Sequence, residues 1–249
     1  MFAALKAEFR KLFTVRTTYG IGGLALLIVI FYAFYVEGLR AGKTAELATK
    51  LASETPGAIQ AVSLLAALVA MLLMTHEYRY NTIMYTLTSA RRRTTVLLAK
   101  IAAVSTFALL FAVIVGVLAP AMAYAGMQLK GLHIAPQHFP LWDIAWQAGF
   151  YAWAYAMFGL LFATLFRSQV ASLVVLFFAP STLELLASLL LKQNAKYLPF
   201  SALSHVLQAG TPGPGPNVMA AGQAALIVCG YLVFGWLIAW ILFIRRDAN

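Results

Sequence analysis

Long apolar stretches separated by short polar segments run along the whole chain and determine its fold class. A helix that crosses a membrane needs about 20 predominantly apolar residues, and six stretches are long enough. We predict spans at 18–37, 57–75, 96–125, 144–166, 169–191 and 218–243. The third is so long that it requires tilt or a kink, and Pro120 near its end is suited to provide one. The pattern predicts an all-α polytopic membrane protein whose residues 1–249 form a single transmembrane domain.

Residues 1–17 carry an amphipathic helical pattern instead of a cleavable signal sequence. Apolar residues recur at helical spacing, and charged residues fall between them: Phe2, Leu5, Phe9, Leu12 and Phe13, then Lys6, Glu8, Arg10 and Lys11. We predict a helix that lies in the inner membrane interface, with its charged residues turned away from its apolar face. No small-residue cleavage site follows the first span, which we therefore expect to be retained.

A basic, amphipathic segment at 76–93 separates the second and third spans. Tyr80, Ile83, Met84 and Leu87 follow the i, i+3, i+4, i+7 spacing of one helix face. Five more residues complete the predicted docking element for a cytoplasmic partner: Glu77, Arg79, Arg91, Arg92 and Arg93. We expect Glu77 to pair with Arg79 or with an arginine of the partner. The alternative interpretation is a charged loop that only fixes topology.

The segment 192–217, before the last span, is too apolar for an ordinary loop and too short to cross a membrane. It predicts a short outer helical hairpin followed by a Pro/Gly linker, with Phe200, Leu203 and Leu207 as a candidate gate. Glu184, inside the fifth span, is either part of a substrate path or a carboxylate that bonds Ser181 or Ser188. Pro180 is expected to kink that span.

Composition and charge agree with a membrane protein and give its orientation. Hydrophobic residues make up 62% of the chain and charged residues only 10%, whereas soluble domains carry about 25% charged residues. Twelve Lys and Arg residues lie on the side of both termini and six on the other. We therefore predict a plasma-membrane protein with both termini in the cytoplasm. The net charge of +10 reflects this topology, with anionic lipid headgroups rather than nucleic acid as its counterpart.

Motifs for catalysis and cofactor binding do not appear in the sequence. Gly42-Lys43-Thr44 has the end of a phosphate-binding loop, but Glu37 stands where the first glycine is needed. The four histidines have no paired metal-ligand spacing, and no nucleophile elbow is present. We expect no enzyme activity, no catalytic residue, no metal and no cofactor in this chain.

Several of these features together resemble the membrane subunit of a type-2 ABC exporter, the type V exporter fold. The likeness is carried by the Leu5–Leu12 run before the first span, by Glu77, Thr82, Leu87, Arg91, Arg92, Arg93 and Lys100, by the apolar outer segment, and by Arg245-Arg246-Asp247. The first resembles the elbow helix of that family and the second set its coupling pattern.

The resemblance implies a permease that works as a homodimer with two separate cytoplasmic ABC ATPase subunits. ATP and Mg²⁺ would bind to those subunits, and a hydrophobic or amphipathic drug, lipid or peptide would be exported. For the dimer seam we expect small residues of the first and fifth spans: Gly22, Gly23, Ala25, Ser181, Ala187 and Ser188. The alternatives are a membrane subunit of another multi-span transport or cofactor-export system, and a lipid-binding scaffold that transports nothing.

Overall fold

The computed structural model describes residues 2–39, 47–85, 93–131, 141–208 and 219–245, and its regular elements in these ranges are all helical. Six segments are long and apolar enough to cross a membrane: Arg16–Tyr35, Ile59–Arg79, Thr94–Leu129, Ala145–Phe166, Gln169–Tyr197 and Ala221–Arg245. They correspond one for one to the predicted spans. The chain is an all-α, multi-span membrane protein.

The elements follow one another with short connections. They are α1 (Phe2–Thr14), α2 (Arg16–Phe31), a π-helical segment (Tyr32–Leu39), α3 (Leu47–Arg79), α5 (Arg93–Leu129), α6 (Leu141–Phe166), α7 (Gln169–Phe178), a second π-helical segment (Ala179–Leu183), α8 (Glu184–Leu191), a 3₁₀ segment (Lys192–Tyr197), α9 (Pro199–Gln208) and α10 (Ala221–Arg245). The predicted N-terminal helix is present as α1, and its place in the membrane interface stays a prediction.

Helix α6 is the centre of the bundle. It packs against α3, α5 and α10, and 67% of its apolar window is buried, against 17% for α2 and 11% for the α7–α8 span. At the contact with α3, a Cβ atom on Gly159 would lie 2.5 Å from the carbonyl oxygen of Ala67. The two helices therefore approach so closely that only glycine fits at this position.

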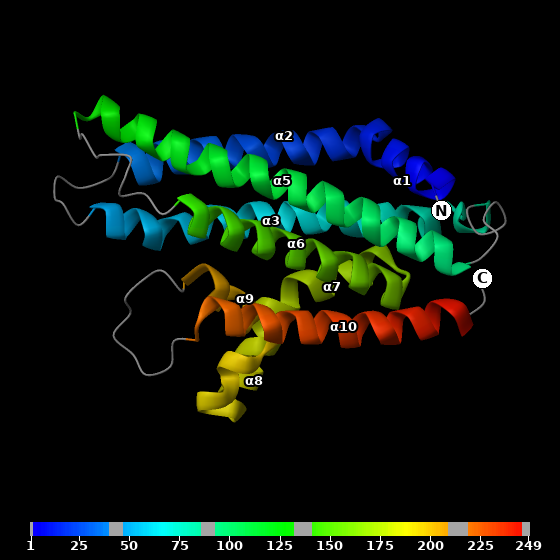
Figure 1. Cartoon of the computed structure of the whole chain (residues 1–249). Coiled ribbons are helices and arrows are strands. Elements are labelled where there is room, and N and C mark those ends of the chain that lie inside the picture. The colour runs from blue at the N-terminus through cyan, green and yellow to red at the C-terminus, as the bar shows by residue number, and fades with distance from the viewer. Residues whose placement is uncertain (1, 40–46, 86–92, 132–140, 209–218, 246–249) are drawn as a thin grey trace.

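Two prolines behave differently from each other. Helix α5 is 37 residues long and continues through Pro120 without ending, so it measures about 55 Å and exceeds the hydrocarbon core of about 30 Å. In the fifth span, Pro180 lies in the π-helical segment between α7 and α8, where a missing N–H disrupts the α-helical pattern. Figure 1 shows α8 projecting away from the bundle beyond this point.

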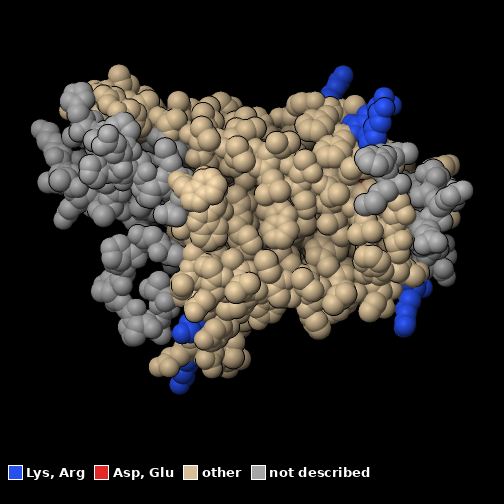
Figure 2. Space-filling model, viewed as in Figure 1, with Lys and Arg blue, Asp and Glu red and all other residues tan. Residues whose placement is uncertain are grey.

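Both ends of the bundle carry basic side chains. Helix α1, the last turn of α3, the first turn of α5 and the last turn of α10 share one end, which we call the α1 end (Figure 1). Lys192 and Lys196 lie at the opposite end, beside α9. On the face in Figure 2, Lys and Arg side chains lie near the two ends and leave the middle uncharged, as expected where lipid surrounds the middle of the bundle.

Candidate functional site

A buried cluster of four charged side chains lies at the α1 end. The Lys100 ammonium donates to Glu8 Oε2 at 2.8 Å and to Glu77 Oε1 at 2.7 Å. Lys11 donates to Glu8 Oε1 at 2.8 Å and to the same Glu77 oxygen at 2.5 Å. The cluster therefore ties together α1, the end of α3 and the start of α5, which are far apart in sequence.

Burial makes this ionic cluster a strong constraint on the three helices. Lys100 is 0% exposed, Glu8 2% and Glu77 5%, so each charge depends on the others for solvation. Partial burial alone would lower the pKa of Lys11, but hydrogen bonds and charges from Glu77 and Glu8 raise it above its usual value. Lys11 is therefore protonated across the physiological pH range.

The sequence interpretation of this cluster was wrong in two respects. Glu77 pairs with Lys11 and Lys100, while Arg79 donates to Gln169 Oε1 at 3.2 Å. Glu8 was expected to turn away from the apolar face, but it faces the bundle. The signal was present, because Glu8 lies three residues after Leu5 and four before Leu12, on the face that Leu12 buries.

The predicted docking helix at 76–93 is interrupted. Helix α3 continues to Arg79, and the chain then turns at Asn81, whose φ is +53°. A new helical stretch starts at Ile83 and includes Tyr85, the last described residue before a gap. Tyr80 therefore does not share a helix face with Ile83 and Met84, because the turn lies between them.

Within the turn region, exposure divides the predicted docking residues. Ile83 is buried against the bundle, whereas Tyr80, Met84 and Tyr85 are 63%, 48% and 78% exposed. Arg79 lies over the Tyr80 ring at 5.7 Å. Leu87, Arg91 and Arg92 lie outside the described residues, and Arg93 begins α5. The described part of the segment thus presents an apolar, aromatic surface beside the charged cluster.

Glu184 caps a helix at the opposite end of the bundle. Its carboxylate accepts the Phe200 N–H at 2.6 Å, the Ser201 N–H at 2.7 Å and the Ser201 hydroxyl at 2.6 Å. These N–H groups belong to the first turn of α9, which lacks helical partners of its own. The expected partners Ser181 and Ser188 instead donate to backbone carbonyls of their own helical segments. Glu184 therefore fastens α9 to the fifth span.

The candidate gate residues lie in the main core. Phe200 packs against Phe158, with ring centroids 4.9 Å apart, and against Tyr155 at 5.5 Å. Leu203 and Leu207 are buried in the same core cluster. Helix α9 is thus a docked outer element, as the apolar pattern indicated, and a gating movement of α9 stays a prediction.

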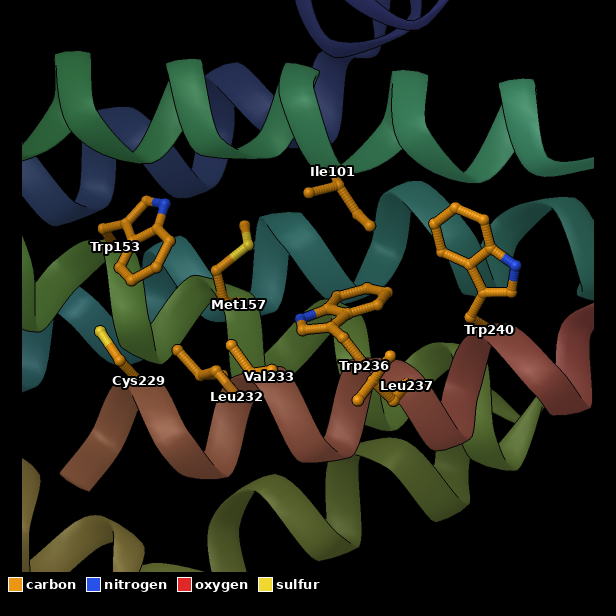
Figure 3. Close-up of a pocket in the computed structure, with 9 residues that line it drawn as sticks. All are labelled: Ile101, Trp153, Met157, Cys229, Leu232, Val233, Trp236, Leu237 and Trp240. Carbon is orange, nitrogen blue, oxygen red and sulfur yellow. The ribbon is translucent and has the colours of Figure 1, made fainter. Parts of the chain in front are cut away.

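A groove rich in tryptophan lies between α5 and α10, with α6 as its floor (Figure 3). Its volume is about 360 Å³. Trp236 and Trp240 rise from α10, and Trp153 comes from α6. Trp153 donates to Ser105 Oγ at 3.2 Å, whereas the buried Trp236 N–H has no acceptor among the described residues. The groove can accommodate an apolar molecule and offer it one hydrogen-bond donor.

Comparison with known families places the chain in one of them. The model of DUF2705, described as a protein of unknown function, matches residues 15–248. The chain belongs to the DUF2705 family. Among curated proteins, no match was found.

The DUF2705 match covers all six spans, with Glu77 and Lys100 of the cluster inside it and Glu8 and Lys11 before its first residue. The description of the family names no activity, so the likeness to exporter subunits rests on the sequence features alone. In the described parts of the chain, no three His, Cys, Asp or Glu side chains gather as a metal site would require. Gly42-Lys43-Thr44 lies outside the described residues.

His205 of α9 should make stability depend on pH. Burial, followed by the positive charge of Lys196, lowers the pKa of His205, and its Nδ1 has no partner among the described residues. An unfolded histidine titrates near pH 6.5, at about its ordinary pKa. Below that pH the unfolded chain binds the proton first, so folding stability falls as the pH falls.

We therefore expect His205→Gln to lose less thermal stability than the natural chain when the pH is lowered from 7.5 to 5.5. The measurement is the melting temperature in detergent at both pH values. Equal pH dependence of the two proteins would contradict this assignment.

Proposed function

We propose that the chain is the membrane permease subunit of an ATP-driven exporter and works as a homodimer with two cytoplasmic ABC ATPase subunits. The observation that carries this proposal is the buried cluster of Glu8, Lys11, Glu77 and Lys100. It joins α1, α3 and α5 at the end where the segment beginning at Ile83 emerges. A force applied to that segment would reach three helices together, because separating them would expose buried charges.

The surface beside the cluster supports a cytoplasmic partner. Tyr80, Met84 and Tyr85 expose apolar and aromatic area next to Arg79, and residues of these types are enriched in the cores of protein interfaces. The predicted orientation puts this end in the cytoplasm, where ATP is available. The partner would supply the ATP and Mg²⁺ sites, since this sequence has no complete phosphate-binding loop.

Low burial of two spans supports a second copy of the chain. The α2 and α7–α8 spans bury only 17% and 11% of their apolar windows. Gly23 and Ser181 are exposed, in keeping with the proposed seam, but Ala25 is 0% exposed within the chain and is withdrawn from it. An apolar molecule could use the tryptophan groove of Figure 3 as part of its route.

Co-purification tests the proposed function directly. The full chain, isolated in native lipid, should retain a subunit with ATPase motifs and hydrolyse Mg-ATP. Recovery of the chain without any ATPase subunit under these conditions would favour the lipid-binding scaffold and overturn the exporter proposal.

A substitution in the docking surface locates the contact. Met84→Asp should lower the affinity for the ATPase subunit at least about tenfold, since a carboxylate would be desolvated in an apolar contact. Met84→Leu is the matched control and should leave affinity near the natural value. Arg92→Gln, at the expected rim, should cost about 1 kcal/mol or less and respond to salt. If Arg92→Gln abolishes binding while Met84→Asp preserves it, the segment acts through charge alone.

A further inference from the structure

A second cavity, of about 650 Å³, adjoins the charged cluster between α1, α2, α3 and the start of the 83–85 helical stretch. Its wall has two distinct parts. Near the α1 end it contains Lys11, Thr17, Thr18, His76, Glu77, Tyr80, Thr82 and Tyr85. Deeper in the bundle it is formed by Ile21, Val69, Leu72 and Leu73. The cavity is therefore polar at its outer end and apolar at its inner end.

The cavity extends well into the membrane-spanning part of α3. Val69 and Tyr80 both line it and are eleven residues apart, which corresponds to about 16 Å along a helix. A single side chain of a cytoplasmic partner would leave most of this apolar wall uncovered. A molecule with a polar head and a hydrocarbon chain fits the gradient along its whole length.

Glu77 indicates what the polar head contains. Its Oε1 accepts two ammonium groups, but its Oε2 is buried and accepts no hydrogen bond from any described residue. A buried carboxylate oxygen without a donor is costly. An N–H donor that enters from the cavity would complete the hydrogen bonding of Glu77.

Lys11 provides the complementary contact. Its side chain is 35% exposed, lines the cavity and uses two donors on Glu8 and Glu77. An ammonium has three N–H donors, so Lys11 can also donate to a phosphate oxygen, with the Thr17 and Thr18 hydroxyls beside it. The cluster contains two cations and two anions, and its zero net charge suits a zwitterion better than an anion.

We propose that this cavity binds a phospholipid with a primary-amine headgroup, of the phosphatidylethanolamine class. The ammonium donates to Glu77 Oε2, the phosphate accepts from Lys11, and the start of an acyl chain lies along Ile21, Val69, Leu72 and Leu73. Binding involves this chain and the lipid alone, so it does not depend on the proposed ATPase partner.

Headgroup methylation provides the sharpest test. Phosphatidylethanolamine, its mono- and dimethyl forms and phosphatidylcholine share charge and shape class but carry three, two, one and no N–H donors. The full chain, without ATPase, is equilibrated with equimolar mixtures of these lipids, and the retained lipid is measured by native mass spectrometry. We expect about a tenfold preference for phosphatidylethanolamine over phosphatidylcholine, equivalent to about 1.4 kcal/mol, with the two intermediates in order.

Two variants place the effect in the cavity. Leu72→Trp fills the apolar part without changing charge and should abolish the preference, whereas Leu110→Trp, at a lipid-exposed position of α5, should preserve it. Glu77→Gln should reduce the preference, and the methylation series on the natural chain decides the matter if this variant does not fold. Equal retention of all four lipids, as expected for water or a partner side chain in the cavity, would overturn the proposal. So would an unchanged preference in Leu72→Trp.

Discussion

Lys100→Met is expected to destabilise the folded bundle by about 3–5 kcal/mol, the range found when one partner of a buried ion pair is removed. Lys100 is 0% exposed and donates to both Glu8 and Glu77. Methionine has similar length but no charge, so both carboxylates would keep only Lys11. Because native stabilities are about 5–15 kcal/mol, much of the protein should be lost from the monodisperse fraction after extraction.

Matched variants separate charge from packing. Lys6→Met removes an exposed cation from α1 and should leave the melting temperature within a few degrees, since surface changes shift stability by about 0.5 kcal/mol or less. Adding Glu8→Gln and Glu77→Gln to Lys100→Met removes the uncompensated carboxylates and should recover part of the lost stability. If the triple variant is less stable than Lys100→Met alone, burial of the carboxylates is not the cause.

The spans could be predicted from sequence because the membrane demands a length and an apolarity that short windows reveal. The structure places all six where they were expected. The turn at Asn81 was not predicted, because helical spacing from Tyr80 to Leu87 gives no sign of a residue with positive φ. Asparagine tolerates this conformation better than most residues, and that is the signal that was available.

The charged cluster could be predicted only in part. Glu77 was recognised as important from its place at the end of a span, but its partners lie 66 residues earlier and 23 later. Such pairings depend on how the helices pack, which periodicity does not encode. Glu184 is a similar case, because its partners on α9 become neighbours only when the chain folds back after the 3₁₀ segment.

Gly159→Ala is expected to loosen the contact between α3 and α6 and to lower stability by about 1–3 kcal/mol, the usual range for overpacking. The new Cβ would lie 2.5 Å from the Ala67 carbonyl oxygen and 3.1 Å from two further Ala67 atoms. Backbone cannot rotate away as a flexible side chain could, so relief requires the helices to separate. Since α6 is the central helix of the bundle, the separation would disturb its other contacts as well.

Gly149 on the same helix provides the control, because a Cβ there would meet no heavy atom within 4 Å. Alanine is favoured over glycine within helices by about 1 kcal/mol, so Gly149→Ala should be neutral or stabilising while Gly159→Ala destabilises. The two effects are measured as melting temperatures of the purified variants in the same detergent. A Gly159→Ala protein as stable as Gly149→Ala would mean that α3 and α6 separate without loss, and the close approach at Ala67 would not be a determinant of the fold.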